Sequence, residues 1–273
     1  MTTTELTDRA FEADRPLEAA LRELRAEAPV ALGFGALVAV GLADQYAPVA
    51  TPLGRAFVAW NGRGVSWISA AEPGDFEAAF SGRVGRPLRP ADGLPERLAR
   101  AIERRLSGDR RARVPLDLRG HSPFEIAVWT KALEIPRGEV RPYAWIAAEI
   151  GRPRAVRAVG TALAHNPVPL VVPCHRVVRS DGKLGQYSMG GPDAKRRVLG
   201  AEGLDTAALE REAASGIRFI GSDTTHIVCH PTCRDARRVT DRHRVGFGSL
   251  AAAEAAGYRP CRHCRPVSLG RAA

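Results

Sequence analysis

The sequence predicts an α/β protein of three domains: an N-terminal domain of β-sheet and helices over residues 1–110, a helical domain over 121–204, and a small metal-organised domain over 216–270. Three observations carry this prediction. An Asn-Gly pair separates two apolar stretches near residue 61, helices in succession begin at Pro123, Pro142 and Pro153, and four of the five cysteines lie in two close pairs near the end. A chain of 273 residues has room for two or three domains of roughly 100–150 residues each.

A β-hairpin is expected in the first domain, because Arg55–Trp60 and Val65–Ser69 are strand-like segments separated by Asn61-Gly62. Asn-Gly supplies the positive φ angles of a type I′ turn. The longest uncharged run, residues 28–43, is too short for a membrane span and is interpreted as buried structure. Residues 109–120 are expected to connect the first domain to the second. Amphipathic helices are predicted at Leu17, Ala20, Leu21 and Leu24, behind a cap at Asp14, and at Leu94, Leu98, Ile102 and Leu106.

The second domain is expected to begin with a helix capped at Ser122, since Pro123 fits a first turn and Glu125 completes a capping box. Helices from Pro142 to Ile150 and from Pro153 to about Asn166 follow, and the short connection between them predicts a helix-turn-helix. In the last helix Val156, Val159 and Leu163 share one face, and Arg154, Arg157 and Thr161 share another. The second face suits contact with DNA phosphates, and a simple solvated arginine face is the alternative.

The net positive charge favours a polyanionic partner but does not by itself establish one. Forty basic residues outnumber thirty acidic ones, and all but three of the basic residues are arginines. An arginine-rich coding bias would give the same excess. The first residues are polar and acidic, where a secretory leader would be basic and then apolar, so we expect a cytoplasmic protein without a membrane segment. In such a reducing compartment the cysteines are expected to be reactive or metal-bound rather than paired in disulfides.

Cys174 is the candidate nucleophile. The apolar residues 167–172 predict a buried strand that leads into Pro173-Cys174-His175-Arg176-Val177. Cysteine beside histidine is weak evidence alone, since buried structural thiols are common. The position after a helix-turn-helix and among arginines favours a thiolate nucleophile whose proton is taken with the help of His175.

These residues resemble the O6-alkylguanine-DNA alkyltransferase family. The resemblance runs from about Ser122 to Gly203. It is carried by residues 166–170 and 173–177, Arg-Ala-Val-Gly at 157–160, Gly-Gln-Tyr-Ser at 185–188 and Ala-Glu-Gly at 201–203. It implies a winged-helix-like active-site domain and a variable N-terminal domain. It also implies irreversible transfer of a methyl or alkyl group from guanine O6 in double-stranded DNA to the protein, once per molecule and without an organic cofactor.

The resemblance also implies roles for individual residues. Cys174 would accept the alkyl group, His175 would take the thiol proton through a water, and Glu202 would orient His175. The base must leave the duplex before sulfur can reach it. Arg157 would fill the vacated stack, and Tyr143 would crowd the phosphate so that the nucleotide rotates. Asn166, Tyr187 and Ser188 would surround the flipped base. The loop 187–192 is one residue longer than the family pattern, which leaves the substrate size open. A non-catalytic lesion-binding or regulatory protein is the alternative, and it would not need Cys174.

The four remaining cysteines predict one structural Zn²⁺. Cys229 and Cys233 form one close pair, Cys261 and Cys264 form another, and this spacing suits a tetrahedral site of four thiolates. One of His226, His230, His243 and His263 could replace a cysteine in the ligand set. A domain of this size is expected to need its metal to fold.

Residues 222–225, 229–234 and 256–266 resemble the metal-binding domain of Ada-type adaptive-response proteins. That resemblance implies that Cys229 is both a zinc ligand and an acceptor of methyl from DNA methylphosphotriesters. Here the metal domain follows the alkyltransferase domain and no second helix-turn-helix array is present, so a full transcriptional switch is not expected. Methyl acceptance at Cys229 and a purely structural or DNA-docking role remain open alternatives. The protein is expected to act as a monomer.

Overall fold

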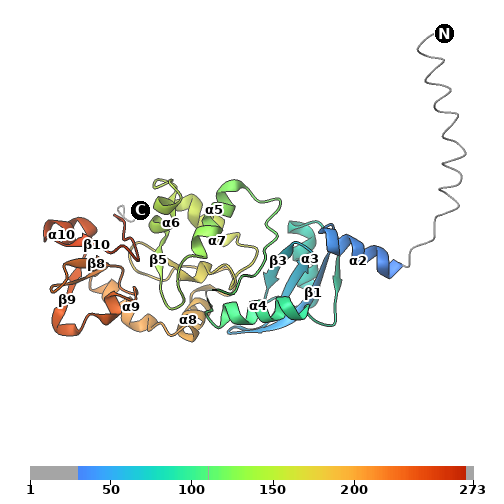
Figure 1. Cartoon of the computed structure of the whole chain (residues 1–273), viewed down its shortest axis with the longest axis horizontal. Helices are drawn as coiled ribbons and strands as arrows, with labels where there is room; N and C mark the ends of the chain where they lie inside the picture. Colours follow the sequence, from blue (N-terminus) through green and yellow to red (C-terminus); the bar gives the residue numbers. More distant parts are fainter. Residues whose placement is uncertain (1–29, 110, 269–273) are drawn as a thin grey trace, which may run out of the picture.

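The computed structural model describes residues 30–109 and 111–268, and its mixture of sheets and helices confirms the α/β class. The molecule is elongated, with an N-terminal sheet at one end, a helical region in the middle and the cysteine-rich region at the other end (Figure 1). The helix expected around Leu17 lies outside the described residues. In chain order the α-helices are α2 (Val30–Val40), α3 (Pro73–Arg83), α4 (Glu96–Leu106), α5 (Pro123–Ala132), α6 (Tyr143–Glu149), α7 (Val156–Ala164), α8 (Gly191–Ala201), α9 (Thr206–Ala214) and α10 (Leu250–Ala255).

The N-terminal sheet has the strand order β3-β2-β1-β4, with β1 (Asp44–Thr51), β2 (Gly54–Asn61) and β3 (Gly64–Ser69) antiparallel and β4 (Leu88–Pro90) parallel to β1. The predicted hairpin is confirmed, but its turn was placed wrongly. Asn61 pairs with Gly64, so the turn residues are Gly62 and Arg63, and neither Asn61 nor Gly62 has a positive φ. Gly62 is needed for another reason: a Cβ there would lie 1.9 Å from the carbonyl oxygen of Ala39 in α2.

Both faces of this sheet are covered. Alternate side chains of β2 point to opposite faces. Phe57 and Ala59 pack with Tyr46 against Phe76 and Phe80 of α3. Ala56 and Val58, on the other face, belong to the main core shared with the helical region. The sheet therefore supports the helical region. Ile68 of β3 donates a backbone hydrogen bond of 2.8 Å to the carbonyl of Pro167, the first residue of the segment 167–172 that leads to Cys174.

The helical region follows the prediction with two corrections. Ser122 and Glu125 form the complete capping box of α5, and α6 and α7 form the helix pair. However, α7 begins at Val156, three residues after Pro153. The expected strand at 167–172 is wrong: these buried residues form a tight turn with a single bridge between Pro169 and Val172, and Leu170 has a φ of 72°. The short parallel pair of β5 (Arg141–Pro142) and β6 (Val177–Val178) lies beside the turn.

The cysteine-rich region is built on a second small sheet with the order β10-β8-β7-β9. Its strands are β7 (Phe219–Ser222), β8 (Ile227–Cys229), β9 (Arg244–Phe247) and β10 (Arg259–Pro260). Phe219, Val228 and Tyr258 pack against Leu250 and Ala253 of α10 on one side of this sheet. The cysteines with Ile220 and Ala236 form a separate cluster.

The run at 28–43 was wrongly expected to be buried. It contains α2, where Leu37 and Val40 are 40% and 55% exposed, and Leu42 after the helix is 58% exposed. Across 30–109 and 111–268, no helix has both the length and the apolar character that a membrane crossing requires.

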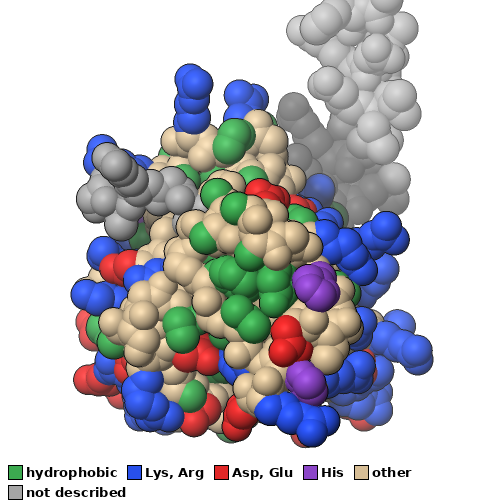
Figure 2. Space-filling model, turned by 90° about the vertical axis from the view of Figure 1, so that its left-hand side faces the viewer, with side chains coloured by type: hydrophobic (Ala, Val, Ile, Leu, Met, Phe, Trp, Pro, Cys, Tyr) green, Lys and Arg blue, Asp and Glu red, His purple; other side chains and the backbone are tan. Residues whose placement is uncertain are grey.

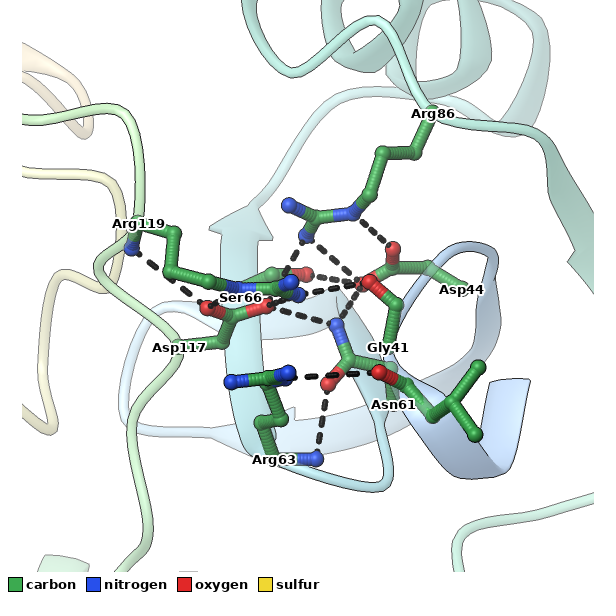
Figure 3. Close-up of polar contacts among 9 residues, drawn as sticks. Gly41, Asp44, Asn61, Arg63, Ser66, Arg86, Asp117 and Arg119 are labelled. Atoms are coloured by element: carbon green, nitrogen blue, oxygen red, sulfur yellow. Dashed lines mark hydrogen bonds and ion pairs between the residues drawn. The ribbon is translucent and has the colours of Figure 1, made fainter. Parts of the chain in front are cut away.

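A buried polar network ties the sheet to the connector at 109–120 (Figure 3). Asn61 donates to Asp44 at 3.0 Å and to Asp117 of the connector at 2.8 Å. Arg86 forms ion pairs with both carboxylates, and Arg119 forms an ion pair with Asp117. Burial alone would raise the pKa of Asp117, but hydrogen bonds from Arg119 and Asn61 and the charge of Arg86 lower it to about 2. The connector is thus anchored to the sheet through the buried carboxylate of Asp117.

Replacing Asn61 with Ala should destabilise the protein by about 3 kcal/mol, because two buried carboxylates lose a shared donor. Urea denaturation at pH 7 measures the change. Arg55→Ala, which removes an exposed ion pair on the same strand, is the matched control and should change stability by less than about 0.5 kcal/mol. Equal effects of the two substitutions would contradict the importance of this network.

Candidate active site and metal centre

Cys174 lies at the start of a single turn of 3₁₀-helix, Cys174–Arg176, and is 6% exposed. The turn that precedes Cys174 fixes the position of this residue, because the side chain of Asn166 forms hydrogen bonds with three groups in this segment. Its side-chain NH₂ donates to the carbonyl of Val172 at 3.0 Å and to the Cys174 sulfur at 3.2 Å, and its side-chain oxygen accepts from the backbone N–H of Val168 at 3.0 Å. Asn166 therefore both shapes the turn and places a donor on the thiol.

A cavity of about 260 Å³ opens beside Cys174. The residues that line it come from α6, α7 and the loop before α8: Tyr143, Gly160, Leu163, Ala164, Gln186, Tyr187 and Ser188. Tyr143, Tyr187 and Ser188, three of the residues singled out in the sequence, thus meet around the sulfur. Asn166 does not line this cavity but donates a hydrogen bond to the sulfur. Arg157 lies apart from them, exposed on α7.

His175 and Glu202 meet at the end of α8. The imidazole Nε2 lies 2.8 Å from Glu202 Oε1, and both side chains are more than nine-tenths buried. An ionised carboxylate can only accept, so Nε2 carries the hydrogen and Nδ1 has the free lone pair. Nδ1 has no hydrogen-bond partner among the described residues. The arrangement leaves one nitrogen of His175 free to accept a proton.

Arg176 completes this centre, and sequence reasoning missed it. Its guanidinium donates to both oxygens of Glu202, at 2.7 to 3.1 Å, and to the carbonyl of Ile135 at 2.7 Å. The backbone N–H of Gly138 donates to Glu202 Oε2 at 3.1 Å. The position of Arg176 next to Cys174 and His175 in the sequence was the signal that could have identified it, but an arginine is ordinarily expected at the surface.

The protonation states follow from burial and these contacts. Burial raises the pKa of the Cys174 thiol, against the smaller effects of the Asn166 hydrogen bond and the charge of Lys195. Burial lowers the pKa of His175 even though Glu202 favours its charged form. Burial alone would raise the pKa of Glu202, but the bonds from His175 and Arg176 lower it to about 2. Around pH 7 the resting state is therefore neutral thiol, neutral imidazole and ionised carboxylate.

Lys195 of α8 is a second residue that the sequence did not single out. It is fully buried, and its Nζ donates to the carbonyls of Val177 and Leu184, both at 2.6 Å, and reaches Gln186 at 3.5 Å. It thereby pins the loop that carries Tyr187 and Ser188. Burial lowers its pKa to about 8.

The four cysteines near the end converge into one cluster. The sulfurs of Cys229, Cys233, Cys261 and Cys264 all lie within 4.8 Å of one another. Backbone N–H groups of His230 and His263 donate to the sulfurs of Cys264 and Cys261, both at 3.3 Å. Four buried sulfurs cannot all ionise together without a cation, and four thiolates around one ion is the geometry that Zn²⁺ prefers. The cysteines form this set by themselves, so a histidine is not needed as a ligand.

Cys229 also lines a cavity of about 310 Å³, whereas the other three cysteines do not. The polar residues that line this cavity carry hydroxyl, basic and acidic groups, namely Ser222, Thr224, Thr225, Thr240, Arg238, His243 and Asp235. Figure 2 shows this end of the molecule, where apolar side chains gather near the centre of the face and basic side chains lie toward its edges.

The site makes a prediction about acid stability. Because the pKa of Glu202 is about 2 in the folded chain against 4.5 as its ordinary value, its ionised form contributes stability above pH 4.5. That contribution, on the order of 3 kcal/mol, should disappear as pH falls from 4.5 toward 2. Thermal melts of wild type and Glu202→Gln across this range measure it. The variant should lose less stability than wild type on acidification, and parallel curves would contradict the assignment.

Two family models match the chain, and together they span more than half of it. The 6-O-methylguanine DNA methyltransferase, DNA binding domain, matches residues 123–204, and the metal binding domain of Ada matches residues 206–267. The second match contains all four clustered cysteines, which identifies their site as a zinc site.

Individual relatives agree. A methylated-DNA–protein-cysteine methyltransferase of Mycolicibacterium paratuberculosis is 52% identical over 89 residues, which are 33% of this chain and 53% of the relative. The bifunctional transcriptional activator/DNA repair enzyme Ada of Escherichia coli is 37% identical over 155 residues, 55% of this chain and 43% of the relative. The matches thus span about half the length of these relatives. A crystal structure of Mycobacterium tuberculosis OGT in complex with DNA has 32% identity and a TM-score of 0.48, covering 61% of this chain and 99% of that one. Residues 123–204 belong to the O6-alkylguanine-DNA alkyltransferase family, and an Ada-type metal-binding domain follows them at residues 206–267.

Proposed function

We propose that this protein repairs alkylated double-stranded DNA by transferring the O6-alkyl group of guanine irreversibly to Cys174. The observation that carries the proposal is the buried set of Cys174, His175 and Glu202 at the edge of a cavity beside the helix-turn-helix. We assign domains to residues 1–110, 121–204 and 216–270, and expect a cytoplasmic monomer. The excess of arginine supports a nucleic-acid partner.

The resting protonation states explain why a base is required. A buried neutral thiol is a poor nucleophile, so its proton must leave as sulfur attacks. Nδ1 of neutral His175 takes that proton through a water, and ionised Glu202 stabilises the imidazolium that forms. The Asn166 amide hydrogen stabilises the developing thiolate. These groups form a proton relay that is active only when an alkyl donor is in place.

The transfer itself is a single displacement. The sulfur of Cys174 forms a bond to the alkyl carbon while the bond between that carbon and guanine O6 breaks, and its electron pair stays on the guanine. The guanine anion takes up one proton, which matches the one that the thiol gave up to His175, so guanine is restored and a thioether remains at Cys174. The cavity must receive a base flipped from the duplex. Tyr143, Tyr187 and Ser188 would surround the base there, while Arg157 on exposed α7 would occupy the gap in the stack.

Cys174→Ala should abolish alkyl transfer while leaving DNA binding unchanged, because Arg157, the residue of α7 proposed to contact DNA, does not line the cavity at the sulfur. Single-turnover transfer from duplex DNA carrying O6-methylguanine and a fluorescence binding titration measure the two properties. Glu202→Gln should slow transfer by about 10²-fold through loss of the oriented base. Undiminished transfer by Cys174→Ala would mean that another residue accepts the group. A wild-type protein that binds the lesion without transfer would support a non-catalytic lesion-binding role.

A second activity is favoured by the cavity at Cys229. In this proposal Cys229, held as a thiolate by zinc, accepts a methyl group from a DNA methylphosphotriester, and Arg238 with the neighbouring hydroxyls binds the phosphate. Methylation would make the thiolate cluster less negative and so strengthen its attraction to phosphate.

Arg238→Ala should slow methyl transfer from methylphosphotriester DNA about tenfold by removing a phosphate contact, with zinc content and transfer to Cys174 unchanged. Arg242→Ala, an exposed arginine that does not line the cavity, is the control. If neither wild type nor variant transfers this methyl group, the metal domain has only a structural or DNA-docking role.

A further inference from the structure

The loop at residues 137–141 lies between the two functional centres and contacts both. It precedes α6 in the chain, and its last residue, Arg141, begins β5. One end meets the catalytic carboxylate of Glu202, and the middle meets the cysteine-rich region. The contacts on each side are specific hydrogen bonds between buried or half-buried groups.

On the metal side, the loop is held by the segment that joins two zinc ligands. Thr232 lies between Cys229 and Cys233 and is 4% exposed. Its hydroxyl accepts from the backbone N–H of Val140 at 2.8 Å and lies 3.3 Å from the Val140 carbonyl. One residue after Cys233, the backbone N–H of Arg234 donates to the Glu139 carboxylate at 3.2 Å.

Glu139 is a buried charge beside the cluster. It is 2% exposed, as is Arg141, with which it forms an ion pair at 2.5 Å. A carboxylate oxygen of Glu139, the sulfur of Cys233 and a ring nitrogen of His263 lie within 4.8 Å of one another. A buried carboxylate is stable only where its partners are fixed. Here Arg234 is one of those partners, and it keeps its place only while the ligand segment is folded.

On the catalytic side, the loop bonds to the residue that orients His175. Gly138 donates to Glu202 at 3.1 Å, and its φ of 72° with a Cβ position 3.1 Å from the Glu202 carbonyl oxygen requires glycine. At its other end Arg141 pairs with Val177, directly after the turn that contains Cys174. A shift of the loop would therefore displace both Glu202 and the nucleophile's turn.

We propose that the zinc-bound cysteine-rich region positions the alkyltransferase centre through this loop, with Glu139 and Thr232 as positioning residues. The inference rests on the proposed alkyl transfer to Cys174. A cysteine-rich region of this size depends on its metal for folding, so the metal fixes Thr232 and Arg234, these fix the loop, and the loop fixes Glu202. Coupling between two sites is reciprocal, so a change at Glu202 must also alter how firmly the cluster holds zinc.

The test uses the full-length, zinc-loaded protein with Thr232→Val, which removes the hydroxyl and keeps the shape of the side chain. Single-turnover alkyl transfer to Cys174 should be about tenfold slower than in wild type. The pH profile of the transfer rate should also shift, because the general base, His175, is no longer held in position. Zinc should remain at one per chain. Glu149→Gln is the matched control, since it weakens the contact with Arg265 between the same two regions without touching the loop. It should transfer at the wild-type rate.

A second, reciprocal experiment measures the rate of zinc release rather than the rate of alkyl transfer. Glu202→Ala should speed zinc release to a chelator about tenfold in the wild-type background and have no further effect in the Thr232→Val background. If Thr232→Val does not fold, Glu139→Gln takes its place in both arms.

A wild-type transfer rate and pH profile in Thr232→Val, or zinc release insensitive to Glu202→Ala, would overturn the coupling. A wild-type protein that does not transfer alkyl groups would refute the proposed function instead, and the zinc-release arm would still decide whether the loop connects the two centres.

Discussion

The centre of this molecule depends on the hydrogen bonds that the buried carboxylate of Glu202 accepts. This carboxylate accepts hydrogen bonds from His175, Arg176 and the backbone of Gly138, which belong to two separate segments of the chain, the turn at 174–176 and the loop at 137–141. Removing water from a carboxylate is costly, and here three donors offset that cost. The same bonds fix the imidazole tautomer, lock the turn that presents Cys174 and close the end of α8 against the loop at 137–141. The stability of this region and the proposed reactivity of Cys174 thus depend on the same carboxylate.

Burial explains why so many donors are needed. A buried thiol holds its proton more tightly than an exposed one, and a buried imidazole resists becoming charged. Each effect alone would suppress reaction. In the proposed reaction they keep the thiol protonated at rest, while the ionised carboxylate of Glu202 favours the charged imidazole that forms when the thiol proton leaves. Asn166 links this chemistry to the fold, since it also builds the turn around residues 166–172.

Much of this could be predicted from local patterns. The capping box at Ser122, the hairpin over β2 and β3 and the four-cysteine spacing are short-range signals, and each is present in the structure. The failures came from long-range contacts. Residue 62 must be glycine because α2 approaches it closely, and not because of the turn type. The apolar segment at 167–172 is buried as a turn because Asn166 and β3 supply its hydrogen bonds. Arg176 and Lys195 look like surface residues until the backbone carbonyls that surround them are known.

The matched metal-binding domain follows the matched alkyltransferase domain, so the four-cysteine cluster and the separate, buried Cys174 lie in one chain. Peptide mass spectrometry after reaction with duplex DNA carrying O6-methylguanine tests the central claim most directly. The account predicts a gain of about 14 Da, one methyl in place of hydrogen, on the peptide containing Cys174, with no more than one equivalent per chain. An unmodified Cys174 peptide, or the methyl group on another residue, would contradict it.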